Sequence, residues 1–138
     1  MSEITRDAFL QDVAKHEMRV LLDAQIDGVM PYRHLRFADP ATVHQHFYLT
    51  CIPGRLVYSG DMGTFVFART VDMFSFFRSG ITPRGLEINE AYWHEKLDAV
   101  DRCDGSRTKG GKKYTTRFIW CLWAIVWGIQ QYDARVRE

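Results

Sequence analysis

The stretch GDMGTFVFARTVDMFSFFR, from Gly60 to Arg78, changes its periodicity at Thr70. Before Thr70 the rings of Phe65 and Phe67 alternate with smaller residues, as in a strand with one buried face. After Thr70 the apolar residues crowd into two helical turns, Val71 to Arg78. The stretch holds five phenylalanines, which cannot all face water. It therefore predicts a strand that runs straight into a short helix inside the core.

Alternating segments precede this stretch, and strong turn signals separate them. The pair Pro53-Gly54 and the run GDMG each mark a chain reversal. Connections this short join antiparallel neighbours, so we expect a four-stranded antiparallel meander. The expected strands are Tyr32 to Phe37, Val43 to Ile52, Arg55 to Ser59 and Thr64 to Arg69. The alternation in the first of them places polar side chains on one face, which predicts a sheet with one wet side.

Helical spacing and capping residues predict helices on both sides of the meander. Thr5 is a suitable N-cap for a helix from Thr5 to Asp23, and Asn89 for one from Glu90 to Arg102. A last helix, Tyr114 to Val136, is apolar almost all round at its centre. The predicted fold class is α+β in a single domain, residues 1–138. It combines the four-stranded meander with an N-terminal helix and two to three C-terminal helices packed on one face.

The composition limits the classes of protein to consider. The 138 residues are 46% hydrophobic, which suits one globular domain, and the net charge of +1 gives no overall attraction to nucleic acid. The three cysteines form no C-x-x-C pattern, which argues against a structural zinc site and fits reduced thiols. The N-terminus is unlike a signal peptide, and the apolar run Phe118 to Ile129 is too short to span a membrane. We expect a cytoplasmic protein of the host cell, with no membrane segment and no cofactor.

Four motifs resemble a known group of proteins: YRHLRF at 32–37, GDMGTFVFAR at 60–69, DMFSFFR at 72–78 and YWHEKLDAVDR at 92–102. Between about residues 7 and 102 the chain resembles a family of small hypothetical proteins carried by phages, prophages and other mobile elements. The resemblance implies a setting and no assigned activity. Small mobile-element proteins without enzymatic motifs often bind a host or defence component, as anti-CRISPR proteins do. The resemblance therefore implies a host or defence-system protein as the partner.

The histidines are the first candidates for chemistry. His44 and His46 lie two apart on one predicted strand face, and together with His34 they suggest a small hydrolase or a metal-dependent enzyme. A third metal ligand is missing nearby, because Cys51 falls on the other strand face. A wet sheet face is therefore the favoured interpretation, and no metal is expected.

Other polar residues offer weaker candidates. Asp61 lies in the turn GDMG, and we interpret it as a turn residue rather than as part of a phosphate site. Cys51 and Cys103 lack an evident base, so we expect no cysteine nucleophile. The sequence contains neither a phosphate-binding fingerprint nor the G-x-S-x-G pattern of a serine nucleophile.

Basic residues suggest a nucleic-acid-binding alternative. A loop with concentrated positive charge suits a phosphate backbone. The candidate residues are Arg107, Lys109, Lys112, Lys113 and Arg117. Arginines and tyrosines also occur together on the predicted strands, as on surfaces that stack on bases. They are Arg33, Arg36, Arg55, Arg69, Tyr32, Tyr48 and Tyr58. A solvated loop with ordinary strand arginines is the simpler interpretation. We expect Arg36 and Arg69 to lie close together if the first and fourth strands are neighbours.

Three tryptophans lie on one stripe of the last predicted helix. Trp120, Trp123 and Trp127 follow the spacing i, i+3, i+7 in a helix with almost no polar side. Either part of this helix is a dimer face or partner site, or it is the central core helix beneath the sheet. Both interpretations remain open. If the helix is an interface, the three tryptophans are the predicted partner-binding residues, together with Arg36 and Arg69.

The sequence thus predicts a non-enzymatic accessory protein of a phage or mobile element. We expect it to bind and block a host or defence macromolecule, as an anti-CRISPR inhibitor or another anti-defence inhibitor does. A nucleic-acid-binding module is the alternative, and an enzyme that uses His34, His44 and His46 is the second alternative. The apolar last helix also suits a homodimer.

Overall fold

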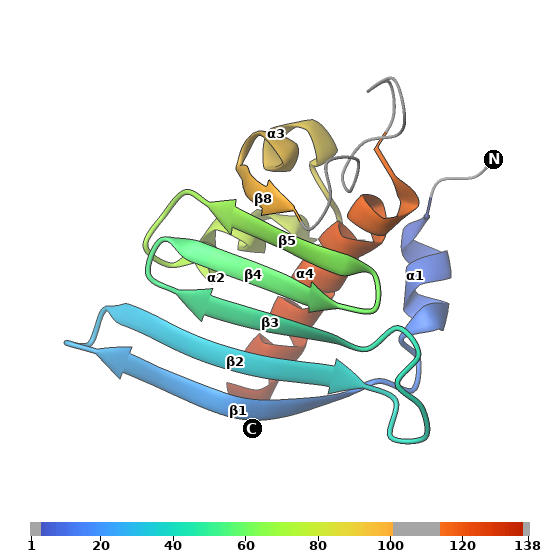
Figure 1. Cartoon of the computed structure of the whole chain (residues 1–138), viewed down its shortest axis with the longest axis horizontal. Coiled ribbons are helices and arrows are strands. Elements are labelled where there is room, and N and C mark those ends of the chain that lie inside the picture. The colour runs from blue at the N-terminus through green and yellow to red at the C-terminus, as the bar shows by residue number, and fades with distance from the viewer. Residues whose placement is uncertain (1–3, 101–113, 137–138) are drawn as a thin grey trace.

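The computed structural model describes residues 4–100 and 114–136. Its centre is a six-stranded antiparallel sheet with the strand order β1-β2-β3-β4-β5-β8. The strands are β1 Glu17–Ile26, β2 Met30–Ala38, β3 Phe47–Ile52, β4 Arg55–Gly60, β5 Gly63–Ala68 and β8 Leu97–Val100. In the described part of the chain, the helices cover one face of this sheet and leave the other face open (Figure 1). They are α1 Arg6–Asp12, α2 Met73–Phe77, α3 Glu90–Glu95 and α4 Thr116–Val136.

Two small elements connect α2 to α3. They are the 3-10 helix η1, Arg78–Gly80, and a ribbon of the two short strands β6 Ile81–Thr82 and β7 Gly85–Leu86. The α+β class, the antiparallel sheet and the N-terminal and C-terminal helices are confirmed.

The four predicted strands are β2 to β5, and they pair in sequence order without a register shift. The start of the second predicted strand differs most from the structure, because β3 starts at Phe47 rather than at Val43. Gln45 has a φ of 60°, a left-handed conformation that ends regular pairing. Its N–H donates to a carboxylate oxygen of Asp61 at 2.9 Å, which fixes this turn against the turn between β4 and β5.

The predicted count of four strands is wrong, and the two missed strands are the two edges of the sheet. The helix expected up to Asp23 ends at Asp12, and the chain then forms β1. A register shift between Val20 and Leu22 leaves Leu21 as an extra residue in the strand. Such a bulge interrupts the two-residue alternation, so that the apolar residues imitate helical spacing. The local pattern therefore predicts the wrong element.

The second missed strand is β8. The helix expected from Glu90 to Arg102 ends at Glu95, and β8, which begins at Leu97, pairs with β5 instead. Leu97 and Val100 lie opposite Phe67 and Phe65 of that strand. Leu97 and Val100 are three positions apart, a spacing that also suits one face of a helix. A strand of four residues is too short to show a clear alternation of its own.

The central part of α4 crosses the covered face of the sheet (Figure 1). Every side chain from Phe118 to Ile129 is buried. Gly128 allows the helix to approach closely, because a Cβ there would lie 2.7 Å from Leu49 and 3.1 Å from the ring of Phe37. The other side of α4 packs against α1, α2, η1 and β7. The helix is apolar all round because it is covered all round. In the described ranges, no helix combines the length and apolar character needed to cross a membrane.

Candidate functional site

The helices leave one side of the sheet uncovered (Figure 1). Along β2 to β5, side chains that point to this side alternate with side chains buried beneath the sheet. We call this surface the open sheet face and define it by its polar centre: Arg19, Tyr32, His34, Arg36, Tyr48 and Thr50. These residues come from β1, β2 and β3.

Two arginines lie directly opposite each other on the open sheet face. The register pairs Arg19 of β1 with Arg36 of β2, and Arg36 in turn lies opposite Tyr48 of β3. Like charges that face each other across two strands destabilise a sheet. No ion pair joins either arginine to a carboxylate of the residues that the structure describes. Within the described residues, this corner of the face therefore carries two arginines that have no ion-pair partner.

Aromatic rings lie next to the two arginines. The ring of His34 stacks on Tyr48 with a centroid distance of 5.3 Å and an angle of 6° between the planes. Its Nδ1 is 2.8 Å from the hydroxyl oxygen of Thr50, which holds the ring in place. His46 approaches the same tyrosine edge-on, at 6.0 Å. Two of the three predicted histidines thus flank Tyr48 and form a ring cluster.

The third histidine lies apart from this cluster. His44 is on the turn before β3, where its Nδ1 is 3.8 Å from a carboxylate oxygen of Asp61. Asp61 is a turn residue, as expected, since its backbone N–H donates to the carbonyl of His46 and its carboxylate accepts from Gln45. Within residues 4–100 and 114–136, no group of three or more histidine, cysteine, aspartate or glutamate side chains is arranged to hold a metal ion.

The predicted pair of Arg36 and Arg69 is not formed by neighbouring strands. Arg36 lies on β2 and Arg69 directly follows β5, and both β3 and β4 lie between those two strands. The condition on which that prediction depended is therefore not met. A different arginine, Arg55, contacts Asp98 of β8 at 3.5 Å near the opposite edge of the sheet.

The tryptophans lie in the core rather than on a surface. Trp120 is fully buried, and Trp123 and Trp127 expose 8% and 9% of their surface. The indole N–H of Trp120 donates to a carboxylate oxygen of Asp12, and that of Trp123 donates to the carbonyl of Ile4, both at 2.9 Å. Of the two interpretations of this helix, the structure shows the core helix beneath the sheet. In the monomer these rings are therefore not accessible to a partner.

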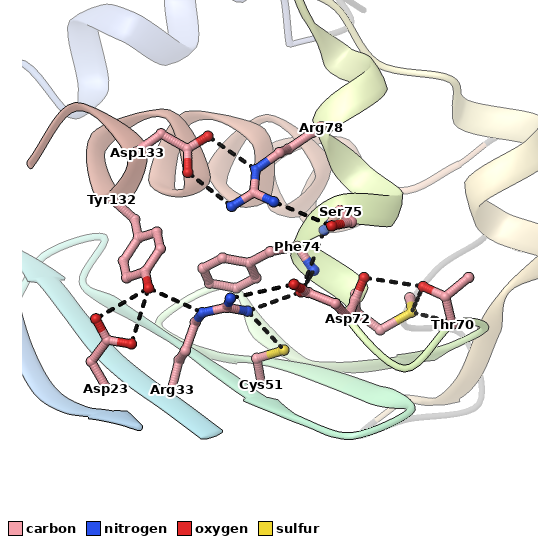
Figure 2. Close-up of polar contacts among 11 residues, drawn as sticks. Asp23, Arg33, Cys51, Thr70, Asp72, Phe74, Ser75, Arg78, Tyr132 and Asp133 are labelled. Carbon is pink, nitrogen blue, oxygen red and sulfur yellow. Dashed lines mark hydrogen bonds and ion pairs between the residues drawn. The ribbon is translucent and has the colours of Figure 1, made fainter. Parts of the chain in front are cut away.

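A buried ionic cluster lies on the covered side of the sheet (Figure 2). Arg33, predicted among the surface arginines, points inward and is only 6% exposed. Its guanidinium donates to both carboxylate oxygens of Asp72, at 2.9 and 3.3 Å, and lies 4.5 Å from the ring centroid of Phe74. Its Nε donates to the hydroxyl of Tyr132, which itself donates to Asp23. The cluster ties β1, β2, α2 and α4 together.

The cluster sets the charge states of its members. Burial alone would raise the pKa of Asp72, but hydrogen bonds from Arg33 and the charge of Arg33 outweigh burial and lower it. Burial alone would lower the pKa of Arg33, yet Asp72 and Tyr132 raise it. Both groups are therefore charged at neutral pH. Asp72 also caps α2 by accepting from the backbone N–H groups of Phe74 and Ser75. These roles are structural.

The buried cysteines have no catalytic character. Cys51 lies beside Arg33, but burial outweighs that positive charge and raises the pKa of the Cys51 thiol. Burial raises the pKa of Cys121 well above its ordinary value. A thiol with a raised pKa carries little thiolate and is a poor nucleophile. Cys103 lies outside the described residues.

Most of the predicted nucleic-acid-binding loop lies outside the described part of the chain. Arg107, Lys109, Lys112 and Lys113 lie outside the described residues. Arg117 is described and lies in the first turn of α4, where it donates to the backbone carbonyl of Met62 at 2.8 Å. That contact ties the start of the helix to the turn between β4 and β5. Tyr58, predicted on the arginine-bearing face, points into the core and is fully buried.

Arg19 is the residue of the open sheet face that sequence reasoning missed. It lies in the segment assigned to the first helix, where it would have no relation to Arg36. The signal that could have placed it is the dipeptide Asp27-Gly28, since both residues have positive φ and form the tight turn between β1 and β2. That turn makes a hairpin and places Arg19 opposite Arg36.

The fold and this open face define a small α+β protein with a polar, aromatic sheet surface. A scan of protein-family models finds no match, and no curated protein or solved structure matches the chain.

Proposed function

We propose that the chain is a non-enzymatic accessory protein of a phage or other mobile element, which binds and blocks a host or defence macromolecule. The open sheet face is the proposed binding surface, in place of the buried tryptophans. The observation that carries this proposal is the uncovered group of Arg19, Arg36, His34 and Tyr48, with its two arginines left without a carboxylate partner among the described residues. Positive charge that costs stability suits a surface whose partner supplies the counter-charge.

A protein is the favoured class of partner. Arginine and tyrosine are the residue types that most often anchor protein interfaces, and on the open sheet face Arg36 and Tyr48 are half-buried while Arg19 is exposed. The chain as a whole has a net charge of only +1 and an isoelectric point near 7.8. Proteins that bind nucleic acid through its phosphates usually carry a stronger basic excess. An acidic patch on a partner protein would match the two arginines.

The proposed mechanism is obstruction, which needs surface complementarity and no reacting group. The residues first considered for chemistry have structural contacts instead. His34 contacts Thr50, and Asp61 holds a turn. A standard protein interface of about 800 Å² on each side would fit on a sheet of this size.

Nucleic-acid binding is the second candidate, and one observation favours it. The paired arginines lie beside the stacked rings of His34 and Tyr48, and this is the combination that single-stranded nucleic acid uses on sheet surfaces. The sequence between β8 and α4 adds basic residues that would extend such a surface.

A capture experiment tests the first proposal. The tagged full chain is incubated with host lysate, and the retained proteins are identified by mass spectrometry. We expect a specific protein to be retained by the wild type and lost with Arg36→Glu and with Tyr48→Ala. The matched control is Arg84→Glu, which makes the same charge change on the exposed turn between β6 and β7. Capture that survives both changes on the open sheet face would remove that face from the proposal.

A fluorescence anisotropy titration with a labelled single-stranded oligonucleotide tests the second candidate. Binding that weakens steeply with added salt and is lost in Arg36→Glu, but not in Arg84→Glu, would favour nucleic acid over protein. Binding that is equally weak in all three proteins would reject it.

A further inference from the structure

The edge of the sheet formed by β1 has an unusual length for a free edge. β1 contains ten residues, and within the described residues it pairs only with β2. The opposite edge, β8, has four residues. A free edge strand presents a row of unpaired backbone N–H and C=O groups, on which another strand can add. The β1–β2 hairpin also projects beyond the rest of the sheet (Figure 1).

Exposed apolar side chains gather on this hairpin. Large apolar residues with at least a third of their surface exposed are scattered singly elsewhere in the described chain. On the hairpin there are five: Leu21, Leu22, Ile26, Val29 and Met30, with exposures of 44%, 50%, 51%, 67% and 41%. An apolar patch of this kind on a folded domain is typical of a surface that is covered in the assembled protein.

The usual protection of an edge strand is incomplete here. Native proteins guard such edges with lysines, prolines or bulges. β1 has a bulge at Leu21, but the five residues after it, Leu22 to Ile26, pair regularly and contain neither lysine nor proline. The one charged side chain among them, Asp23, turns to the covered side and accepts from Tyr132. A regular, unguarded apolar edge therefore follows the bulge.

We propose that this edge binds a second copy of the chain, by antiparallel pairing of β1 with β1 about a two-fold axis at Ala24. The register would place Leu22 opposite Ile26 of the second copy, and Ile26 opposite its Leu22. Leu22, Ala24 and Ile26 share one face of the sheet, so every contact across the joint on that face is apolar. On the other face Asp23 would lie opposite Gln25, whose amide can donate to the carboxylate.

Among the registers centred on Asp23, Ala24 and Gln25, only the one centred on Ala24 makes β1 self-complementary. A two-fold axis perpendicular to the sheet keeps each residue on its own face, so the axis must pass next to a single residue of β1. The neighbouring alternatives to Ala24 are Asp23 and Gln25. A centre at Asp23 would place two carboxylates directly opposite each other. A centre at Gln25 would bring Asp23 opposite Asp27 and lose the contact of Leu22 with Ile26. Like charges in these positions oppose pairing, whereas the centre at Ala24 avoids both.

The two-fold axis would place the open sheet faces of both copies on the same side. Two six-stranded sheets would then form one continuous surface. This dimer can form without a host partner, so the proposal does not depend on the proposed function. An interface of five paired residues and one apolar cluster is small, so we expect a dimer that dissociates on dilution.

Sedimentation velocity of the full chain, over a series from low micromolar to submillimolar concentration, tests the pairing. We expect a concentration-dependent shift from monomer to dimer. The double substitution Leu22→Lys and Ile26→Lys should raise the dissociation constant by about tenfold or more, because each introduced lysine would lie directly opposite an introduced lysine of the second copy. The control Val71→Lys changes an apolar residue with 56% exposure outside the hairpin and should leave the dimer unchanged.

A cross-link locates the axis independently of those substitutions. Directly opposed Cα atoms in an antiparallel pair are about 4.5–5.5 Å apart, within the range that a disulfide spans. In a Cys103→Ser background, Ala24→Cys should therefore form a covalent dimer under a mild oxidant. Ala91→Cys, on the exposed surface of α3, should not. A monomer at every concentration, or a dimer that persists with both lysines and no Ala24→Cys cross-link, would overturn the proposal.

Discussion

Arg33 and Asp72, 39 positions apart in the chain, form a two-pronged ion pair between β2 and the first residue before α2. The arginine is 6% exposed and the aspartate side chain 29% exposed. The charge of Arg33 thus depends almost wholly on Asp72 for compensation, whereas Asp72 retains contact with water and two backbone N–H groups. Because of this difference in exposure, replacing Asp72 and replacing Arg33 should lower the free energy of unfolding by different amounts.

Removing the aspartate should therefore cost more than removing the arginine. We expect Asp72→Ala to lower the free energy of unfolding by about 3–5 kcal/mol, because it leaves a buried charge without a partner. Arg33→Met should cost less, since the exposed part of Asp72 stays hydrated. Urea denaturation measures both, with Arg84→Met as a control on an exposed ion pair that should change little. Equal losses for Asp72→Ala and Arg33→Met would contradict the asymmetry.

The same pair predicts a loss of stability in acid. Arg33 lowers the pKa of Asp72 below its ordinary value of 3.8, so the unfolded chain binds this proton more readily than the folded chain. The stabilisation is complete above the unfolded pKa and is lost as the pH falls through the lower folded pKa. The free energy of unfolding should be compared for the wild type and Asp72→Asn. Their difference should shrink as the pH falls from about 5 to about 2. A difference that stays constant over this range would show that Asp72 does not titrate as described.

For the opposed arginines of the open sheet face we expect the opposite effect: replacing one of them should raise the free energy of unfolding. Replacing Arg19 with glutamine removes a like-charge contact with Arg36. We expect the free energy of unfolding to rise by roughly 0.5 kcal/mol at low salt, and the gain to fade as salt screens the charges. Thermal or urea unfolding at two ionic strengths measures this. A loss of stability at low salt would mean that the two guanidinium groups do not repel each other in the folded protein.

The buried thiols should react only when the protein opens. Cys51 and Cys121 are fully buried, and burial raises the pKa of both. In a Cys103→Ser variant, a thiol-reactive dye should modify the folded protein many times more slowly than the denatured protein. Rapid modification of either cysteine at neutral pH would revive the idea of a reactive cysteine.

Local pattern alone predicted the centre of the sheet. The strands β2 to β5 alternate regularly and are joined by tight turns, so each pairs with its neighbour in sequence and needs no distant partner. The last helix was also predictable, because its unbroken apolar run has no other stable form in a single domain. Its Gly128 is the one position on that run where the sheet comes close enough to exclude a side chain.

The tertiary structure decided the edges, the buried charges and the surface. β1 and β8 became strands because sheet edges were available to pair with, although a bulge at Leu21 and a length of four residues hid their alternation. Arg33 became a core residue because the distant Asp72 meets it there, a contact that no local spacing encodes. The tryptophans were covered because two layers enclose α4. Periodicity reports which side of an element is apolar, whereas only the packing of distant elements decides what covers that side.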